Sequence, residues 1–339
     1  MSTGPTPSPR SVDSVNLGDA DLNARINAGM VQVETLLQER LNRGENFITS
    51  KVNHLVRAGG KRFRPMMALL ASQYGPRPGC LEVIKAAAIV EIVHLATLYH
   101  DDVMDEAEKR RGVDSANSRW GNSVAILAGD ILLSHSSRLM SELDTRTVEH
   151  FADTFEELVT GQMRETIGTS DGLSAIDHYM TVIREKTGVL IASAGYLGAL
   201  HSGADEDTID ALYRLGRVIG IIFQIVDDMI DIFSDTTESG KTPGTDLREG
   251  VFTLPVLFAL DEDTPIGAEL RSLLTGPLEN DAEVAHALEL LARSTGRART
   301  MAVIEELLAE AEAQISRLPE CETTDALRQL SSYTIRRVG

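Results

Sequence analysis

Residues 86–105 read AAAIVEIVHLATLYHDDVMD, and residues 213–233 read YRLGRVIGIIFQIVDDMIDIF. In both stretches apolar residues recur every three or four positions, which is the spacing of a helix with a buried face. Each stretch carries an aspartate-rich pentad, DDVMD at 101–105 and DDMID at 227–231. These stretches therefore predict two long helices that bring acidic clusters next to apolar sequence.

The spacing of proline extends the helical prediction to most of the chain. No proline occurs between Pro78 and Pro243, and proline is typical of turns and strand edges, so its absence favours long helices. Sustained alternation of apolar and polar residues is missing, as are the Asn-Gly pairs of tight hairpins. There is no Ser/Gly/Pro-rich linker in the body and no internal repeat. We predict one all-α domain over residues 21–339, after a disordered tail of residues 1–20.

The composition narrows the class of protein. The chain has 339 residues, 42% hydrophobic and 24% charged, which is an ordinary globular balance. A formal net charge of −19 argues against binding to nucleic acid or to anionic membranes. No apolar run is long enough to span a membrane, and the first twenty residues lack an apolar signal core, so we expect a cytoplasmic protein. Two cysteines, Cys80 and Cys321, favour a reducing compartment, with a single long-range disulfide left open.

The aspartates of each pentad share one face of their helix. Residues three and four apart are neighbours on a helix surface, which groups three carboxylates in each motif. Like charges packed this densely need a cation among them, and Mg²⁺ prefers carboxylate oxygens and bridges to substrate phosphates. The candidate metal ligands are Asp101, Asp102 and Asp105 in the first motif and Asp227, Asp228 and Asp231 in the second.

The acidic motifs have two other interpretations. A single pentad is as readily a solvated acidic face as a site, but two matches beside apolar sequence arise by coincidence on the order of one time in a hundred. A di-iron helical bundle needs Glu-x-x-His on two helices. Next to the acidic motifs only Glu91 and His94 have that spacing, so the di-iron interpretation is disfavoured.

Basic residues precede and follow the first acidic motif. GGKRFRP, residues 59–65, places three cations before a helix that Pro65 is predicted to begin, and a basic helix N-terminus with flexible glycines suits a diphosphate. A second group, KRR at 109–111, follows Asp105 within about two helical turns. His94 lies two turns before Asp101 on the same face, where a packed core histidine is the simpler interpretation. Taken singly, each basic group would more often be solvated surface.

These motifs resemble, in order, those of the trans-isoprenyl diphosphate synthases, and most closely the long-chain polyprenyl diphosphate synthase branch. The matching segments are GGKRFRP, EIVHLATLYHDDVMDEAEKRRG, REKTG, FQIVDDMIDIF and GKTPGTDLREGVFTLPVLFAL. The resemblance covers residues 45–260 and extends more loosely to the C-terminus. It implies an antiparallel helical bundle around a deep central cavity, the isoprenoid synthase fold, usually as a homodimer.

The resemblance also implies a role for each motif. The enzyme would be a prenyltransferase that uses Mg²⁺, three ions with substrate bound, to condense isopentenyl diphosphate head-to-tail (1′-4) onto an allylic diphosphate. Both aspartate triads would bind the metal, and Lys186 would act with them in catalysis. Isopentenyl diphosphate would be held by Lys61, Arg64, His94 and Arg111. The allylic diphosphate would be held by Arg110, Lys186, Thr187, Gln224 and Lys241. Val251 stands where many short-chain members have a second lysine, which weakens the transfer of contacts in that loop.

The helix before Asp101 bears on product length. Counting back along it, Ala96, Val93 and Ile89 form one stripe toward the expected tail pocket, with Thr97 beside them. In relatives that make short products, bulky aromatic residues near the Ala96 position close the pocket. Small residues here favour a long all-trans product, and a helix of about 31 Å at 1.5 Å per residue has room for such a chain. Alternatively, Ala96 is only a close-packing residue, or Ile89 or Leu132 provides an earlier floor.

Three rival functions remain on the sequence alone. A geranylgeranyl or farnesyl diphosphate synthase would share every motif and differ only in product length. A non-catalytic subunit of a heteromeric synthase would be expected to lose acidic or basic motifs, and this chain keeps both. A class I terpene cyclase would lack the GGKRFRP segment because it holds no second diphosphate.

Overall fold

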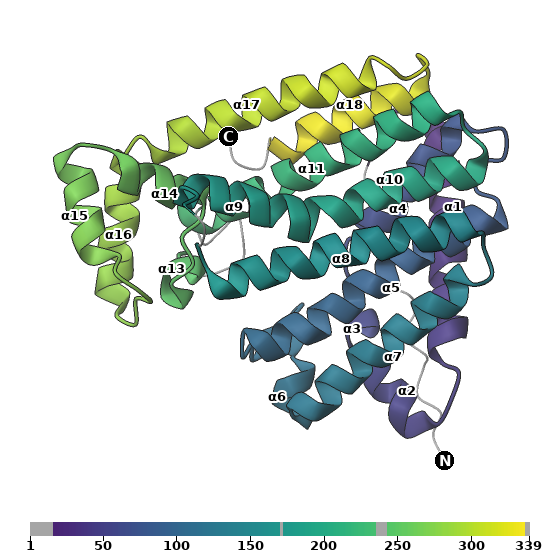
Figure 1. The fold of residues 1–339 in the computed structure, drawn as a ribbon, viewed down its shortest axis with the longest axis horizontal. Coiled ribbons are helices and arrows are strands. Elements are labelled where there is room, and N and C mark those ends of the chain that lie inside the picture. Colours follow the sequence, from purple (N-terminus) through teal and green to yellow (C-terminus); the bar gives the residue numbers. More distant parts are fainter. Residues whose placement is uncertain (1–15, 170–171, 235–242, 336–339) are drawn as a thin grey trace.

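The computed structural model describes residues 16–169, 172–234 and 243–335. Helices form nearly all of the described chain, as the predicted all-α class requires (Figure 1). They are α1 (Ala20–Leu41), α2 (Asn46–Val52), α3 (His54–Arg57), α4 (Phe63–Ala71), α5 (Leu81–Met104), α6 (Ala116–Trp120), α7 (Asn122–Met140), α8 (Thr145–Ile167), α9 (Ala175–Ile183), α10 (Val189–Ser202), α11 (Glu206–Phe233), α13 (Thr245–Glu249), α14 (Leu254–Asp261), α15 (Pro265–Leu273), α16 (Asp281–Arg293), α17 (Gly296–Ile315) and α18 (Glu322–Ile335). Short elements are the 3₁₀-helix η1 (Ser72–Tyr74), the π-helix η2 (Arg184–Gly188) and the strands β1 (Lys109–Arg110) and β2 (Val113–Asp114).

The two long helices predicted from the acidic stretches are α5 and α11. Helix α5 has 24 residues and begins after Cys80, as the sequence predicted. Helix α11 has 28 residues and begins at an N-cap, where the Asp205 side chain accepts a hydrogen bond from the Thr208 backbone N–H. Helix α11 therefore starts at a side-chain cap, and both helices carry their aspartates in or just after their last two turns.

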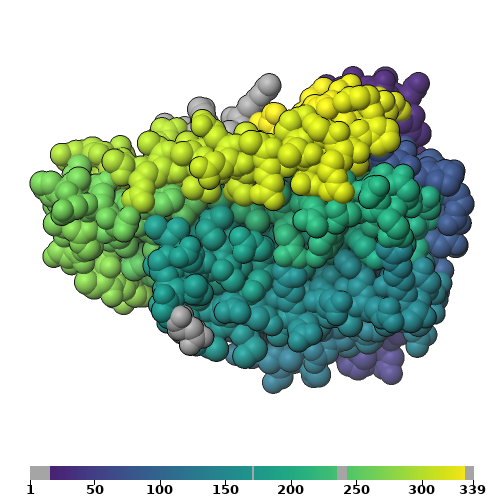
Figure 2. Space-filling model, turned by 45° about the horizontal axis from the view of Figure 1, so that its top comes forward, coloured from purple at the N-terminus to yellow at the C-terminus, as the bar shows by residue number. Residues whose placement is uncertain are grey.

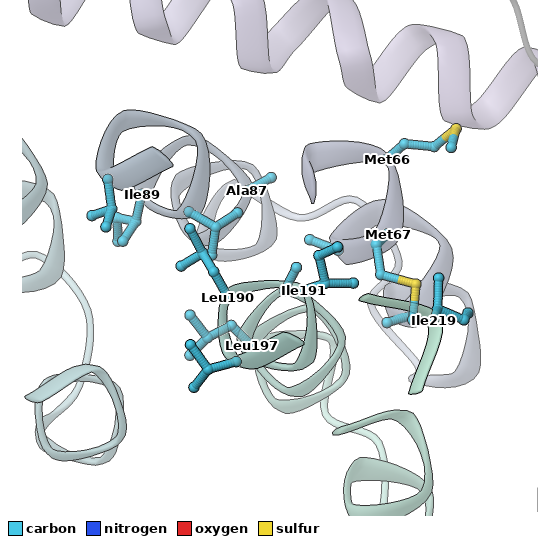
Figure 3. Packing of buried hydrophobic residues seen from close by; sticks show 14 of the residues in the cluster. Met66, Met67, Ala87, Ile89, Leu190, Ile191, Leu197 and Ile219 are labelled. Atoms are coloured by element: carbon cyan, nitrogen blue, oxygen red, sulfur yellow. The ribbon is translucent and has the colours of Figure 1, made fainter. Parts of the chain in front are cut away.

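Helix α10 lies at the centre of the bundle and packs against α4, α5, α8 and α11 (Figure 1). Glycines allow the close approach: a Cβ on Gly198 would lie 2.1 Å from the Ala68 carbonyl oxygen of α4, and one on Gly216 would lie 2.6 Å from the Ile191 carbonyl oxygen. Figure 3 shows the side chains that fill this junction. They come from four helices: Met66, Met67, Ala87, Ile89, Leu190, Ile191, Leu197 and Ile219. The centre of the molecule is thus a tightly packed apolar core.

The C-terminal helices cover one side and one end of this core. Helices α17 and α18 pack on α11, and Figure 2 shows them as a ridge along the upper side of the molecule. Helices α13 to α16 enclose a second, smaller apolar cluster that includes Ile232, Leu247 and Leu290. Because Ile232 belongs to α11, this cluster anchors the end of the helix that carries the second acidic motif.

Two local predictions were wrong. The sequence indicated no hairpin, but β1 and β2 pair as an antiparallel ribbon in which Arg110 faces Val113. The two turn residues, Arg111 and Gly112, have φ of 53° and 76°, so Arg-Gly takes the place of the expected Asn-Gly. The second error concerns Pro65, which is the third residue of α4 rather than the first. Its missing N–H still falls in the first turn, where backbone donors have no helical partner.

Some predictions fall partly or wholly outside the described residues. Lys241 and residues 1–15 of the predicted tail lie outside them. Leu17 is buried and the Asp19 side chain caps α1, so the folded chain extends at least four residues before the predicted boundary. In the described part of the chain, no helix combines the length and apolarity needed to cross a membrane. Both cysteines are free thiols.

Candidate active site

The first acidic motif ends α5, and its three carboxylates have different surroundings. Asp102 is fully buried, and its Oδ1 accepts a 2.6 Å hydrogen bond from Nε of Arg110, while Oδ2 has no partner among the described residues. Asp101 is half-buried, and Asp105 is the exposed C-cap. Burial, followed by the charge of Asp105, raises the pKa of Asp101 to about 6, although Lys186 lowers it. Carboxylates at a helix C-terminus oppose the helix dipole, so this end of α5 favours a bound cation.

Asp228 of the second acidic motif is held by hydrogen bonds from its own helix, α11, and from α9. Asp228 is buried, its Oδ1 accepts a 2.8 Å bond from Nε2 of Gln224, and its Oδ2 accepts a bond from the Tyr179 hydroxyl. Burial raises the pKa of Asp228 to about 7, the Tyr179 and Gln224 hydrogen bonds oppose the rise, and Asp227 and Asp231 add to it. Positive charge placed beside this carboxyl group would favour its ionised form.

Asp231 joins the second motif to the helix that follows. Its Oδ1 accepts a hydrogen bond from the Thr245 backbone N–H at 3.2 Å, and its Oδ2 accepts one from the Asp246 N–H at 3.1 Å. Its backbone carbonyl accepts a 2.9 Å bond from the Gly244 N–H. Asp231 thus holds the start of α13 against the end of α11, while each oxygen keeps a second lone pair for another ligand.

Charges on other elements link the two motifs. Glu249, at the end of α13, has a raised pKa because it is partly desolvated and because Asp105 and Asp231 both act on it. Lys186 forms an ion pair with Glu165 and lowers the pKa of both Asp101 and Asp105. The ends of α5, α8 and α11 and the π-helix η2 therefore meet in one strongly charged region.

A cationic cluster lies beside the first motif. His94 is surrounded by positive charge: burial and then Arg64, Arg111, Arg62 and Arg110 hold its pKa well below the usual range. Arg64 has its own pKa lowered to about 10, chiefly by burial and also by Arg111, against the attraction of a nearby glutamate. The buried Nε of Arg64 has no hydrogen-bond partner among the described residues. An anion would relieve this concentration of positive charge.

Arg62, in contrast, is neutralised within the protein. Its Nη1 donates to Glu91 at 2.8 Å, and its Nε donates to Glu34 at 3.2 Å. Its φ of 50° places it in the left-handed region as the N-cap of α4. The three basic residues of GGKRFRP therefore differ. Arg62 forms ion pairs within the protein, whereas Arg64 keeps an unpaired donor. Lys61 is exposed.

The second basic group is fixed by the ribbon. Arg111 Nη1 donates to the carbonyl oxygens of Leu55, at 3.2 Å, and of Gly59. A Cβ on Gly60 would lie 2.9 Å from Cζ of Arg111, so the glycine makes room for this guanidinium. The hairpin turn and the Gly59–Gly60 pair together bring Arg111 of the second basic segment next to the first.

The REKTG segment forms the π-helix η2 between α9 and α10. Such π-turns frequently interrupt α-helices at functional sites. Thr187 Oγ1 donates to Oε1 of Gln224 at 3.2 Å, which continues the chain of hydrogen bonds to Asp228. The predicted residues Lys186, Thr187 and Gln224 are thus brought together from two helices, and each contacts or lies close to an acidic group.

The donor set fits a hard divalent cation. In the described part of the chain, no group of three or more His, Cys, Asp or Glu side chains is placed to hold a metal unaided. The available ligand atoms are carboxylate oxygens, among them the unpaired Oδ2 of Asp102. Mg²⁺ typically takes one or two protein carboxylates and completes its shell with water and substrate phosphates. The two motifs suit that mode of binding.

A family model described as polyprenyl synthetase matches residues 45–291, which is well over half of the chain and contains both acidic and both basic motifs. The chain belongs to this family.

Individual members of the polyprenyl synthetase family are similar over nearly the whole chain. Nonaprenyl diphosphate synthase of Mycobacterium tuberculosis is 51% identical over 97% of this chain and 98% of its own length. A geranylgeranyl pyrophosphate synthase of Corynebacterium glutamicum, crystallised with calcium and isoprenyl diphosphate, is 62% identical, with a TM-score of 0.89 over 96% of this chain and 100% of that chain. A decaprenyl diphosphate synthase of Rhodobacter capsulatus is 33% identical, with a TM-score of 0.84 over 94% and 99%.

The stripe predicted to set product length is buried in this polyprenyl synthetase. Ile89, Val93 and Ala96 have no exposed surface. Thr97 is half-buried, and its hydroxyl donates to the His94 carbonyl oxygen at 2.9 Å. On this part of α5 the accessible side chains are therefore His94, Thr97 and Leu98 rather than the Ile89–Ala96 stripe. The role of the stripe in product length stays a prediction.

Three residues of the site were not found from the sequence. Tyr179 bonds to Asp228, Glu165 pairs with Lys186, and Glu249 faces both motifs. None belongs to a repeated motif, and each reaches the site through tertiary packing. Only Glu249 carried a signal, because it lies in the DLREG segment used for the family resemblance.

Proposed function

We propose that this chain is a Mg²⁺-dependent trans-polyprenyl diphosphate synthase that adds isopentenyl units to an allylic diphosphate and releases a long all-trans polyprenyl diphosphate. One observation carries the proposal: two aspartate motifs on α5 and α11 and a cationic cluster around His94 meet in one region of the fold. Cationic side chains would hold diphosphates, and carboxylates would hold the metal ions that neutralise diphosphate charge, so the reaction needs both kinds of charge. Membership of the polyprenyl synthetase family supports the same chemistry.

We assign the site residues to two substrate diphosphates and to the metal. Lys61, Arg64, His94 and Arg111 would bind the diphosphate of isopentenyl diphosphate, and Arg64 offers the unpaired donor noted above. Arg110, Lys186, Thr187, Gln224 and Lys241 would bind the allylic diphosphate. Mg²⁺, when bound by the aspartates of the two motifs, would neutralise the diphosphate charge that develops as the leaving group departs.

The reaction balances as a substitution at carbon. The allylic C–O bond breaks, leaving a delocalised cation and a diphosphate whose charge Lys186 and Arg110 would stabilise. The double bond of isopentenyl diphosphate forms the new C–C bond with that cation. A proton then leaves the adjacent carbon for the released diphosphate, since no side chain stands out as a dedicated base. Apolar side chains around the reacting carbon would keep water away from the cation.

Product length separates two candidate functions. Small residues at Ala96 and Thr97 and the 51% identical nonaprenyl diphosphate synthase of M. tuberculosis support a long product. The 62% identical structure from C. glutamicum is a geranylgeranyl pyrophosphate synthase, which favours a shorter one. We infer the long product, and geranylgeranyl diphosphate is the second candidate.

Assembly and location form part of the same proposal. Helix α8 exposes an apolar stripe along its outer face, with Val148, Val159, Met163 and Ile167 at helical spacing. Such a stripe on an otherwise acidic protein supports a homodimer through α8. Free thiols at Cys80 and Cys321 support a cytoplasmic location. Sedimentation of the wild type and of Val159→Asp would test the dimer, because the charge is expected to leave a monomer.

The test of function is a product analysis with purified protein. Isopentenyl diphosphate, Mg²⁺ and each allylic primer would be incubated together, and the products weighed by mass spectrometry. Asp101→Ala is expected to abolish turnover while leaving the helical circular dichroism unchanged. Asp263→Ala, at an exposed loop position, is the matched control and should keep wild-type turnover. Near-normal rates in Asp101→Ala would refute the metal role, and a twenty-carbon end product would select the second candidate.

A further inference from the structure

A pocket of about 280 Å³ lies apart from the two aspartate motifs and is lined mainly by basic side chains. Its lining residues come from the end of α1, the loop that follows it and the second half of α7: Arg40, Arg43, Gly44, Ser134, His135 and Arg138. None of them was placed among the contacts to either substrate. The volume is close to the lower end of small-molecule pockets, which is roughly 300 Å³.

The charge around this pocket opposes that of the whole chain. The protein carries a formal charge of −19, yet three arginines line this single pocket. Lys85 adds a fourth cation, through a 3.1 Å ion pair with Glu142. Glu142 also takes both Nη atoms of Arg40, at 2.6 and 2.8 Å, and Glu39 acts on Arg40 at longer range. Four cations thus face two carboxylates, so net positive charge remains uncompensated.

The remaining charge belongs to Arg43 and Arg138. In the described part of the chain, neither side chain forms an ion pair or a hydrogen bond, and both are exposed. His135, between them, has its pKa lowered by burial and then by Arg138, Arg43 and Arg40, and no carboxylate acts on it in the opposite direction. Arginines near a helix C-terminus are favoured by the helix dipole. That effect accounts for Arg40 and Arg138 but not for Arg43, which lies beyond the end of α1.

We propose that this pocket binds a phosphate-bearing anion, held by the forked guanidinium groups of Arg43 and Arg138 and by the Ser134 hydroxyl. Guanidinium groups match phosphate oxygens in pairs of parallel hydrogen bonds. Arg40 contributes charge while it stays fixed by Glu142, and neutral His135 offers one further N–H. The site would be distinct from the substrate diphosphate sites, and its ligand would be a small phosphate ester or a phospholipid headgroup.

Calorimetric titration of the full-length protein with inorganic phosphate, at constant ionic strength and with EDTA, tests the site. Arg43→Gln/Arg138→Gln should weaken binding by about tenfold or more for each guanidinium lost. The matched control is Arg214→Gln/Arg293→Gln, which removes the same charge from two exposed helix pairs and should leave the dissociation constant unchanged. Arg64→Gln, in the proposed substrate site, should leave this binding intact.

Co-sedimentation with vesicles separates the two sources of phosphate. Phosphatidylcholine vesicles with and without phosphatidic acid would be compared for the wild type and the Arg43/Arg138 double variant. Vesicle binding that requires phosphatidic acid and is lost in the double variant assigns a headgroup, whereas binding of inorganic phosphate alone assigns a free solute. The proposal is overturned if neither ligand binds, if the double variant binds as the wild type does, if the control variant loses binding equally, or if only Arg64→Gln abolishes it.

Discussion

Two arginines that lie two residues apart in the basic loop are expected to respond to substitution in opposite directions. Arg62 is buried and forms ion pairs with Glu91 and Glu34, whereas Arg64 is half-buried with an unpaired Nε. The perturbation is Arg62→Met and, separately, Arg64→Met. Methionine keeps most of the apolar stem of arginine in both cases and removes only the guanidinium group.

The magnitudes follow from what each substitution leaves behind. Arg62→Met strands the carboxylate of Glu91, which is 2% exposed, and an uncompensated buried charge costs about 3–5 kcal/mol. Arg64→Met removes a cation whose pKa is lowered to about 10. Since a guanidinium is charged at neutral pH in both the folded and the unfolded chain, that lowered pKa destabilises the fold by about 3 kcal/mol. Its removal should stabilise the unliganded protein by up to that amount.

Urea unfolding at neutral pH measures the stability of both variants. The KM for isopentenyl diphosphate measures how far each substitution weakens substrate binding. Arg62→Met should lower the free energy of unfolding, and Arg62→Met/Glu91→Gln should recover much of the loss because no charge is then stranded. Arg64→Met should raise the free energy of unfolding while raising KM strongly. Equal destabilisation by both single variants would refute the assignment, as would a raised KM in Arg62→Met without loss of stability.

Three further predictions concern the motifs and the core. Between about pH 4 and pH 7 the metal-free protein should lose thermal stability as pH rises, because half-buried Asp101 and buried Asp228 have raised pKa values and must then ionise in the folded protein. Calorimetry in EDTA should show this slope, and Mg²⁺ should reduce it. Ala96→Phe should shorten the product seen by mass spectrometry, and an unchanged product distribution would exclude Ala96 from the pocket. Gly198→Ala should cost about 1–3 kcal/mol or more in urea unfolding, because the new Cβ meets the backbone oxygen of Ala68; a neutral result would mean that α4 and α10 can separate.

The sequence predicted those parts of the site that depend on helical periodicity. Spacing of three and four residues placed Asp101 and Asp105 on one helix, and the apolar periodicity gave the correct course for α5 and α11. Spacing could not show that Asp102 points inward to Arg110. The position of Arg110 depends on a short antiparallel ribbon, with two residues in each strand and an unusual Arg-Gly turn. Nor could it find Tyr179, whose hydroxyl reaches Asp228 only because α9 packs beside α11.

Three residues other than glycine have positive φ in the described chain, namely Arg62, Glu106 and Arg111, and all three flank the site. A left-handed conformation costs roughly 1–2 kcal/mol, so neighbouring contacts must impose it. Arg62 and Arg111 are held by ion pairs and carbonyl oxygens. Glu106 is exposed and lies one residue after Asp105. Its left-handed backbone conformation is therefore imposed only by the turn in which it lies.

Glu106 therefore offers a test of how tightly the turn after the first motif is built. Glu106→Gly relieves the strain of the positive φ, but glycine loses more backbone entropy on folding, and the two effects are similar in size. The free energy of unfolding should therefore change by less than about 1 kcal/mol. Glu106→Val, which is β-branched and disfavours positive φ, should lower it by about 1–2 kcal/mol and reduce turnover by displacing Asp105. Urea unfolding and steady-state rates would measure both variants. If valine were tolerated as well as glycine, the left-handed turn would not be what positions Asp105.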